Sequence, residues 1–301
     1  MAQQAPSGSG ISISPTTSDF TIARGQAQKL DITLKNITVG NITAQAYIND
    51  FTSDNHTGSP KIITDPNNKL PTSIKDFVHG LSDVPLKKGE QKKITVALQI
   101  PAKATPGAYY GIIRFKAVPA GEGAPEAGQV ALSASVGTIV FITVPGTIKE
   151  QVQLTALHVY NGKHEGTFFF RKPSGIGVEI KNLGNGLAKP FGTIELQDMF
   201  GKGVYNYQLN NTTPRGNVLP GSSRIFTDKV KNISRPGRYT VQASVAYGSG
   251  SEVLVIKKTF WYIPSWLLAI VLAVLVLLIL ATFWAYRRHH LSLKRIHRRR
   301  G

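Results

Sequence analysis

The chain has 301 residues, a formal net charge of +18 and no cysteine. The absence of cysteine excludes a scaffold held by disulfides, which exported animal domains often use. The positive charge suits an anionic neighbourhood such as wall polymers or lipid headgroups. Nucleic acid is another interpretation of that charge, but the lysines are scattered across strand faces rather than clustered. We therefore expect no nucleic-acid partner and a bacterial rather than an animal origin.

Residues 1–10 are small and polar. They contain neither the basic start nor the apolar centre of a signal peptide. We expect a flexible N-terminus at 1–10 that resembles the start of a mature exported chain, with the signal peptide apparently absent.

Residues 11–145 show strand periodicity. In 29–35, Leu30, Ile32 and Leu34 share one face while charges occupy the other, as in a half-buried antiparallel strand. The pattern recurs at 93–100, and further strands are predicted at 44–51, 109–118 and 130–144. The turn-rich stretch 119–128 predicts an exposed hairpin loop. The sequence therefore predicts a first immunoglobulin-like β-sandwich over 11–145.

A second set of strands follows the break at Pro145 and Gly146. Seven short strands are predicted, separated by frequent turns, at 152–159, 177–181, 192–197, 204–209, 225–230, 239–246 and 252–259. This density of strands and turns is typical of an immunoglobulin-like sandwich. We assign the second sandwich to 146–260, so the fold class is all-β with two tandem sandwiches.

Two sequence markers recur in the same order in both halves. A strand ends in Lys-Asn at Asn36 and again at Asn182, and a Pro-Gly-x-Tyr motif ends at Tyr109 and again at Tyr239. The tyrosine hydroxyl in such a motif can bond back to the corner of a sandwich. The repeated pair predicts two copies of one fold.

The first half contains extra chain. From Asn36 to Gly107 is 71 residues, whereas from Asn182 to Gly237 is 55. The polar, turn-rich stretch 51–86 is the best place for an insertion, and long insertions often carry function.

We predict that this insertion binds wall glycan, because sugar rings stack on aromatic side chains and nearby polar groups orient them. The same side chains could equally fill the core, and the segment could be a solvated loop tucked on the sheet. The candidate residues are Asp50, Phe51, His56, Lys61, Phe77 and His79.

Catalysis and metal binding find little support in the sequence. The chain contains no nucleophile or phosphate-loop motif, and no carboxylate pair is indicated. His158, His164 and Glu165 surround an Asn-Gly turn, which describes a hairpin better than a ligand set. We predict no catalytic residue, no metal and no cofactor. An enzyme, most naturally a wall hydrolase, is the third hypothesis.

Residues 266–284 carry no charge and one hydroxyl, and as a helix they would be about 28 Å long, close to the hydrocarbon core of a bilayer. We predict a transmembrane helix over 261–286. Aromatic side chains flank it and are expected at the headgroup level: Trp261, Tyr262, Trp266, Trp284 and Tyr286.

The tail, 287–301, contains seven basic residues and no acidic one: Arg287, Arg288, Lys294, Arg295, Arg298, Arg299 and Arg300. This bias predicts a cytoplasmic tail and an extracellular N-terminal region. The tail could also lie on the inner leaflet, where anionic lipid attracts it. Removing its seven charges from the total leaves +11 on the rest of the chain.

The motifs together resemble a known family. They are Pro106-Gly-Ala-Tyr-Tyr-Gly in the first half and Asn182-Leu-Gly-Asn-Gly with Lys189-Pro-Phe-Gly in the second, followed by one span and a basic tail. This organisation resembles the WxL-interacting proteins of Gram-positive cell surfaces. The resemblance implies that the first domain binds peptidoglycan and the second holds a WxL-type surface protein. It implies no particular binding residue.

The leading hypothesis is therefore a membrane-anchored surface adaptor whose partners are peptidoglycan or another anionic wall polymer, a surface protein and membrane lipid. The alternative is a membrane-anchored chaperone or assembly subunit that presents a sheet edge to a client strand.

Overall fold

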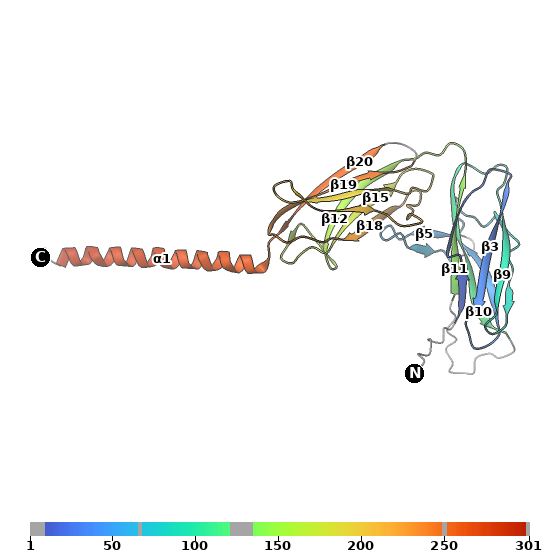
Figure 1. The fold of residues 1–301 in the computed structure, drawn as a ribbon, viewed down its shortest axis with the longest axis horizontal. Helices are drawn as coiled ribbons and strands as arrows, with labels where there is room; N and C mark the ends of the chain where they lie inside the picture. The colour runs from blue at the N-terminus through green and yellow to red at the C-terminus, as the bar shows by residue number, and fades with distance from the viewer. Residues whose placement is uncertain (1–9, 66–67, 121–134, 249–251, 299–301) are drawn as a thin grey trace.

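The computed structural model describes residues 10–65, 68–120, 135–248 and 252–298, and of 289–298 it describes the backbone alone. The strands form two β-sandwiches, and a long helix follows the second one (Figure 1). The all-β class with one C-terminal helix is therefore confirmed.

The first sandwich packs a four-stranded sheet, in the order β1-β3-β9-β7, against a five-stranded sheet, in the order β2-β11-β10-β4-β8. A separate hairpin, β5–β6, leaves this body. The bounds are β1 (Ile11–Ser14), β2 (Thr17–Thr21), β3 (Ala27–Asn36), β4 (Ile42–Asn49), β5 (Phe51–Ser53), β6 (Pro60–Ile62), β7 (Val78–His79), β8 (Val84–Leu86), β9 (Gln91–Gln99), β10 (Gly107–Pro119) and β11 (Ser135–Val144). The predicted loop 119–128 and the start of the strand predicted at 130–144 lie mostly outside the described residues.

The second sandwich has sheets in the orders β13-β12-β15-β18 and β14-β20-β19-β16-β17. Its strands are β12 (Val152–Asn161), β13 (His164–Glu165), β14 (Phe168–Phe169), β15 (Gly175–Asn182), β16 (Phe191–Gln197), β17 (Gly203–Leu209), β18 (Ser223–Lys229), β19 (Gly237–Ala246) and β20 (Val253–Tyr262). All seven predicted strands are present. The two-residue strands β13 and β14 are too short to leave a periodic pattern in the sequence.

The two sandwiches are copies of one arrangement. In both five-stranded sheets a short strand pairs in parallel with the last strand of the domain, β2 with β11 and β14 with β20, and the other strands follow in equivalent order. In both domains the apolar face of the sheets forms the core, as in β3, where Ile32 and Leu34 have no exposed surface.

The repeated sequence markers perform the same task in each copy. The Asn36 side-chain amide donates to the carbonyl oxygen of Gly40 at 2.8 Å, and that of Asn182 donates to the carbonyl oxygen of Gly186 at 2.8 Å. Each asparagine therefore closes the turn that follows its strand.

The tyrosine corners also match. The Tyr109 hydroxyl donates to the carbonyl oxygen of Thr105 at 3.0 Å, and the Tyr239 hydroxyl donates to that of Arg235 at 2.7 Å. The predicted tyrosine corners are thus confirmed in both copies.

Helix α1 (Ser265–Arg298) contains a stretch, Ser265–Arg288, that is long and apolar enough to cross a membrane. Its 24 residues rise about 36 Å, which exceeds a hydrocarbon core of about 30 Å. Trp266, Trp284 and Tyr286 are exposed along it, so their headgroup contacts stay a prediction.

The start of the helix differs from the prediction. Trp261 and Tyr262 belong to strand β20, so the helix begins at Ser265 rather than at 261. Tyr262 is 6% exposed within the second core. The prediction that Tyr262 lies at the headgroup level is therefore corrected, because its ring is buried in protein.

Candidate functional site

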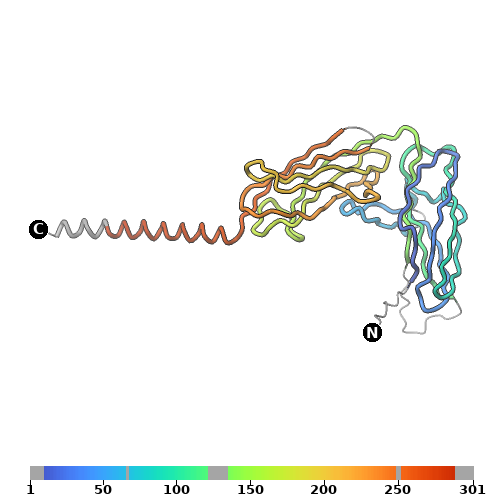
Figure 2. Tube along the Cα trace, in the orientation of Figure 1, coloured from blue at the N-terminus to red at the C-terminus, as the bar shows by residue number. Residues whose placement is uncertain are grey.

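The inserted segment of the first domain reaches the second domain. Hairpin β5–β6 extends from the first sandwich to lie against the second (Figure 1; Figure 2, light blue). The Ile225 N–H on β18 donates to the carbonyl oxygen of His56 at 2.7 Å, and the Ser223 N–H donates to Asn55 Oδ1 at 3.3 Å. Because β18 is the edge strand of its sheet, the hairpin tip occupies that edge.

Asp54 shapes the hairpin tip. Its Oδ1 accepts the N–H groups of His56 at 2.9 Å and Gly58 at 2.8 Å, while Oδ2 accepts the Thr57 hydroxyl. The hydrogen bond from Thr57, followed by those from the backbone, holds the pKa of Asp54 well below its usual value. Gly58 has φ +79°, a conformation that favours glycine, and a Cβ there would lie 2.6 Å from Arg224 Nε, so any other residue would also displace the Arg224 side chain.

Phe51 lies at the junction of the two domains. Its ring centroid is 5.1 Å from that of Tyr110 and 6.4 Å from that of Phe141, and Leu187 and Leu219 of the second domain complete the cluster. Phe51 is only 3% exposed. A buried ring cannot stack on a sugar, so the predicted glycan contact of Phe51 is corrected to an interdomain packing role.

Asp50 and Phe77 are buried as well. Asp50 has no exposed surface, accepts the Leu70 N–H at 3.1 Å and lies 3.4 Å from Lys75 Nζ. Phe77 belongs to the first core, with its ring centroid 4.8 Å from that of Tyr109. The alternative that these side chains fill the core is therefore correct for both residues, because a buried side chain cannot contact a glycan.

The remaining three predicted residues are exposed but dispersed. His56 lies at the hairpin tip, Lys61 on β6 and His79 on the edge strand β7. The six predicted residues therefore do not form one site.

Tyr47 is the most exposed aromatic side chain among the described residues of the first sandwich, at 41%. It lies on β4 directly opposite Arg114 of β10, whose guanidinium carbon is 6.0 Å from the Tyr47 ring centroid. The Tyr47 hydroxyl donates to Gln45 Oε1 at 3.0 Å, and exposed Lys116 is the register partner of Gln45. The four side chains form one patch, which we call the Tyr47 patch.

The sequence contained a weak signal for this patch. Gln45 and Tyr47 alternate outward in the predicted strand 44–51, but their pairing with Arg114 and Lys116 follows from the register of β4 and β10, which the sequence does not reveal.

The family-like motifs of the two domains meet at the junction. The Ala108 N–H donates to the carbonyl oxygen of Asn185 at 2.9 Å, and the Asn185 side-chain amide donates to that of Pro106 at 3.2 Å. A Cβ on Gly107 would lie 3.0 Å from the Asn185 carbonyl oxygen. Lys189 adds an ion pair with Asp19 at 2.7 Å. The Pro-Gly-x-Tyr and Asn-Gly motifs thus also fit the domains together.

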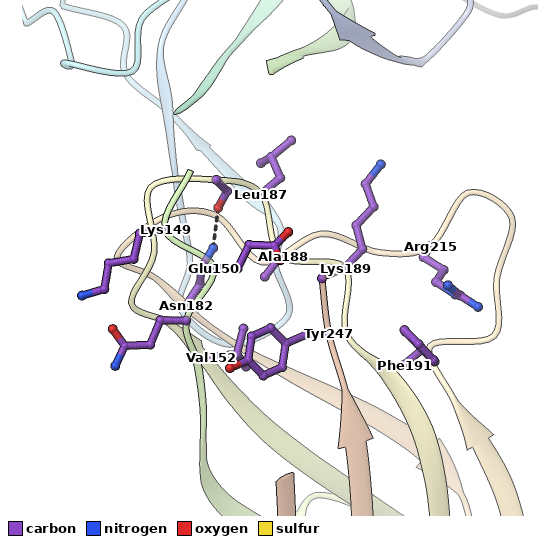
Figure 3. A pocket seen from close by; sticks show the side chains of 13 residues that line it. Lys149, Glu150, Val152, Asn182, Leu187, Ala188, Lys189, Phe191, Arg215 and Tyr247 are labelled. Carbon is purple, nitrogen blue, oxygen red and sulfur yellow. Dashed lines mark hydrogen bonds between the residues drawn. The ribbon is translucent and has the colours of Figure 1, made fainter. Parts of the chain in front are cut away.

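A hollow of about 270 Å³ lies at the end of the second sandwich that faces the first (Figure 3). Lys149, Val152, Tyr247 and Phe191 contribute to its lining, and Arg215 stacks over the Phe191 ring at 4.4 Å. A hollow lined by both positively charged and apolar side chains has groups suited to binding a segment of another protein.

The histidine cluster considered above is a group of hydrogen-bonded side chains. His158 Nδ1 lies 2.8 Å from Glu165 Oε1, and Nε2 lies 3.4 Å from Glu179 Oε2. Within the described part of the chain, no group of three or more histidine or acidic side chains is arranged to hold a metal ion.

Comparison with known proteins gives one family match. Residues 15–117 match the model described as "WxL Interacting Protein, peptidoglycan binding domain". The match confirms the resemblance that the motifs indicated, and it lies within the first sandwich and the inserted segment.

The solved structures that are similar to this chain include bacterial chaperones. The class 5 fimbriae chaperone CfaA is 14% identical, with 82% of this chain and 98% of that chain covered and a TM-score of 0.41. The Escherichia coli chaperone DraB is 13% identical, with 83% and 96% covered and a TM-score of 0.36. These likenesses concern the fold alone. No curated protein sequence matches the chain.

Proposed function

We propose that this chain is a membrane-anchored adaptor of the Gram-positive cell surface, because residues 15–117 match the peptidoglycan-binding domain model of the WxL-interacting proteins. The first domain binds the wall, the second binds a surface protein, and α1 tethers both to the membrane. The family match over 15–117 is the observation that carries this proposal. The basic tail supports a cytoplasmic C-terminus and an extracellular N-terminal region.

The Tyr47 patch is the best supported wall contact in this proposal. The apolar face of a sugar ring can stack on Tyr47, and Gln45 can orient its hydroxyl groups. Arg114 and Lys116 suit carboxylates of the wall peptides, because guanidinium binds carboxylate with paired hydrogen bonds. His56, Lys61 and His79 lie on other elements and form the second set of candidates.

The test is sedimentation of the full chain, held in nanodiscs, with purified peptidoglycan. Replacing Tyr47 by alanine should weaken binding about tenfold, or about 1.4 kcal/mol. Val39→Ala is the matched control, because Val39 is 79% exposed on the same domain and lies outside the patch. Equal binding by Tyr47→Ala and Val39→Ala would place the wall site elsewhere, and the exposed His56, Lys61 and His79 would be replaced next.

The chaperone alternative makes a different prediction. A chaperone would bind a client strand at an open sheet edge such as β17 and would need no wall. Retention of the full chain by isolated cell walls without any client supports the adaptor, whereas retention that requires a client protein supports the alternative.

A further inference from the structure

Five large apolar side chains are exposed together at the end of the second sandwich that adjoins α1. Their exposed fractions are 60% for Phe168, 57% for Phe170, 52% for Met199, 81% for Phe200 and 39% for Trp261. We call these five residues the end patch. Neither wall binding nor partner binding, as proposed above, uses them.

Strand register brings three separate segments to this end. Phe168 on β14 pairs with Trp261 on β20, and Gly237 on β19 pairs with Tyr262 at the end of β20. A Cβ on Gly237 would lie 3.2 Å from Met199 Sδ, so the turn after β16 lies beside the same strand ends.

Two of the exposed rings lie on or directly after strand β14, Phe168 on the strand and Phe170 next to its end. The Trp261 N–H donates to the carbonyl oxygen of Thr167 at 2.7 Å, and the Ile263 N–H donates to that of Phe169 at 2.9 Å. Phe169 points inward, 3% exposed, with its ring edge-on to Phe260 at 5.9 Å between centroids. Because side chains alternate along a strand, Phe168 faces outward, and Phe170 directly after the strand is exposed as well.

The turn that carries Phe200 is equally well built. The Asp198 N–H donates to the carbonyl oxygen of Lys202 at 2.9 Å, and Asp198 Oδ1 accepts the N–H groups of Phe200 and Lys202 at 2.9 and 3.0 Å. Gly201 supplies the left-handed conformation that the turn requires, with φ +78°. The exposure of Phe200 is therefore fixed by the fold.

The position of α1 identifies what this patch faces. The candidate span begins at Ser265, three residues after Tyr262, and an extended residue covers at most about 3.6 Å. Trp261 of the end patch therefore lies within about 14 Å of the start of the span along the chain, and strand register places the other rings around Trp261. If α1 is inserted, the nearest large apolar phase is the bilayer itself.

The charges at this end fit a lipid surface. Four exposed basic residues lie beside or between the apolar ones: Arg171, Lys172, Arg235 and Arg238. The one acidic side chain in the 198–202 turn, Asp198, is engaged by backbone N–H groups. Aromatic rings with interleaved cations are typical of surfaces that sit in the headgroup region of anionic membranes.

We propose that the end patch docks the second sandwich on the outer leaflet of the membrane that α1 crosses. The rings of Phe168, Phe170 and Phe200 enter the interface, and the basic side chains bind anionic headgroups. This proposal rests on the membrane anchoring proposed above. Its consequence is that the second sandwich has a fixed tilt and does not swing freely on α1.

The experiment uses the full chain in nanodiscs, with single cysteines that are unique because the chain has none. A polarity-sensitive fluorophore is attached at Lys202→Cys beside the patch, at Val39→Cys on the first sandwich and at Leu275→Cys inside α1. Quenching by brominated lipid reports contact with the bilayer. We expect quenching at positions 202 and 275 and none at 39.

The two proposals fail in different ways. If position 275 is quenched and position 202 behaves like position 39, the end patch does not dock although the anchor is intact. If position 275 is not quenched, the membrane anchoring fails, and the docking proposal fails with it.

A triple variant tests the rings directly. Phe168→Ser, Phe170→Ser and Phe200→Ser together should lower quenching at position 202 by about threefold or more, because less apolar surface enters the interface. The matched control changes three exposed apolar residues of the first sandwich, Ile37, Val39 and Ile62, to serine and should leave quenching unchanged. Should the triple variant lose its strand-rich spectrum, Phe200→Ser alone replaces it, because that ring is 81% exposed.

Lipid composition tests the cations. Nanodiscs of phosphatidylglycerol should give stronger quenching at position 202 than discs of phosphatidylcholine, and added salt should reduce the difference. Equal quenching in both lipids would overturn the assignment of the basic side chains to headgroups, and equal quenching by the triple variant would overturn the docking surface.

Discussion

Replacing Leu219 by alanine should separate the two sandwiches without unfolding either. Leu219 belongs to the second domain, yet it is 7% exposed in a cluster with Phe51, Tyr110 and Phe141 of the first. Leucine-to-alanine changes in cores cost about 2–5 kcal/mol. At a junction that can open to water the cost falls near the low end, about 2 kcal/mol, which is about a 30-fold shift toward the undocked state.

Single-molecule energy transfer measures this shift directly. Dyes attached at Val39→Cys and Asn206→Cys report the separation of the two sandwiches, and both positions are exposed. Leu219→Ala should enlarge the low-transfer population, while Met199→Ala, at the opposite end of the second sandwich, should leave the distribution unchanged. An unaltered distribution in Leu219→Ala would refute the argument, and so would a loss of the second domain's own stability by the same amount.

Further predictions concern single interactions. Because the folded state lowers the pKa of Asp54, its carboxylate stabilises the fold above its unfolded value of about 4, and this contribution is lost as pH falls below that value. Asp54→Ala should therefore lower the unfolding midpoint at pH 7, and this effect should become progressively smaller as the pH falls below about 4. A double-mutant cycle of Lys189→Ala with Asp19→Ala, measured as free energies of unfolding in urea, should give a coupling free energy of about 1 kcal/mol or less, because the ion pair is exposed. Tyr239→Phe should reduce the free energy of unfolding in urea by about 1 kcal/mol through loss of one hydrogen bond. Residues 11–263 alone should give a soluble, strand-rich monomer by circular dichroism and light scattering.

Local patterns in the sequence were sufficient to predict the strands and the internal repeat. The alternation around Ile32 reflects a physical need, since one face of a sheet packs on the core and the other meets water. Asn182 and Tyr239 each bond to a backbone carbonyl four residues away along the chain, and this part of their role could be recognised without the fold. The second bond of the Asn182 amide, to the carbonyl oxygen of Val218, depends on the fold.

The prediction of glycan contacts at Asp50, Phe51 and Phe77 was wrong because their burial depends on residues distant in the sequence. Phe51 lies in a polar, turn-rich stretch, and nothing nearby in the sequence shows that Leu187 and Leu219 cover it. An apolar residue in such a stretch can serve a ligand or a distant surface, and only the fold distinguishes the two. Likewise, Tyr47 becomes a candidate only when β4 and β10 are set in register.

The error at Tyr262 could have been avoided. Residues along β20 alternate between exposed and buried at its end, with Trp261 outside and both Phe260 and Tyr262 inside. The same alternation is visible in the sequence, where Lys257 and Thr259 share the outer face with Trp261. An aromatic cluster before an apolar run is typical of a membrane interface. Because the cluster was interpreted in this way, the alternation of exposed and buried residues that marks a strand was overlooked.

The inserted hairpin would hold the two domains of the proposed adaptor at a fixed spacing. Two domains joined only by the short connection at 145–151 would reorient freely unless a sizeable interface held them. Here the tip of hairpin β5–β6 accepts a hydrogen bond from β18, and Asn185 bonds to the backbone on either side of Gly107. Two separated contacts therefore resist rotation of one domain relative to the other. Rigid spacing matters for a protein that binds a wall from a membrane, because each degree of freedom lost on binding costs free energy. An adaptor that is already ordered avoids that cost, and the end patch would extend the same ordering to the lipid surface.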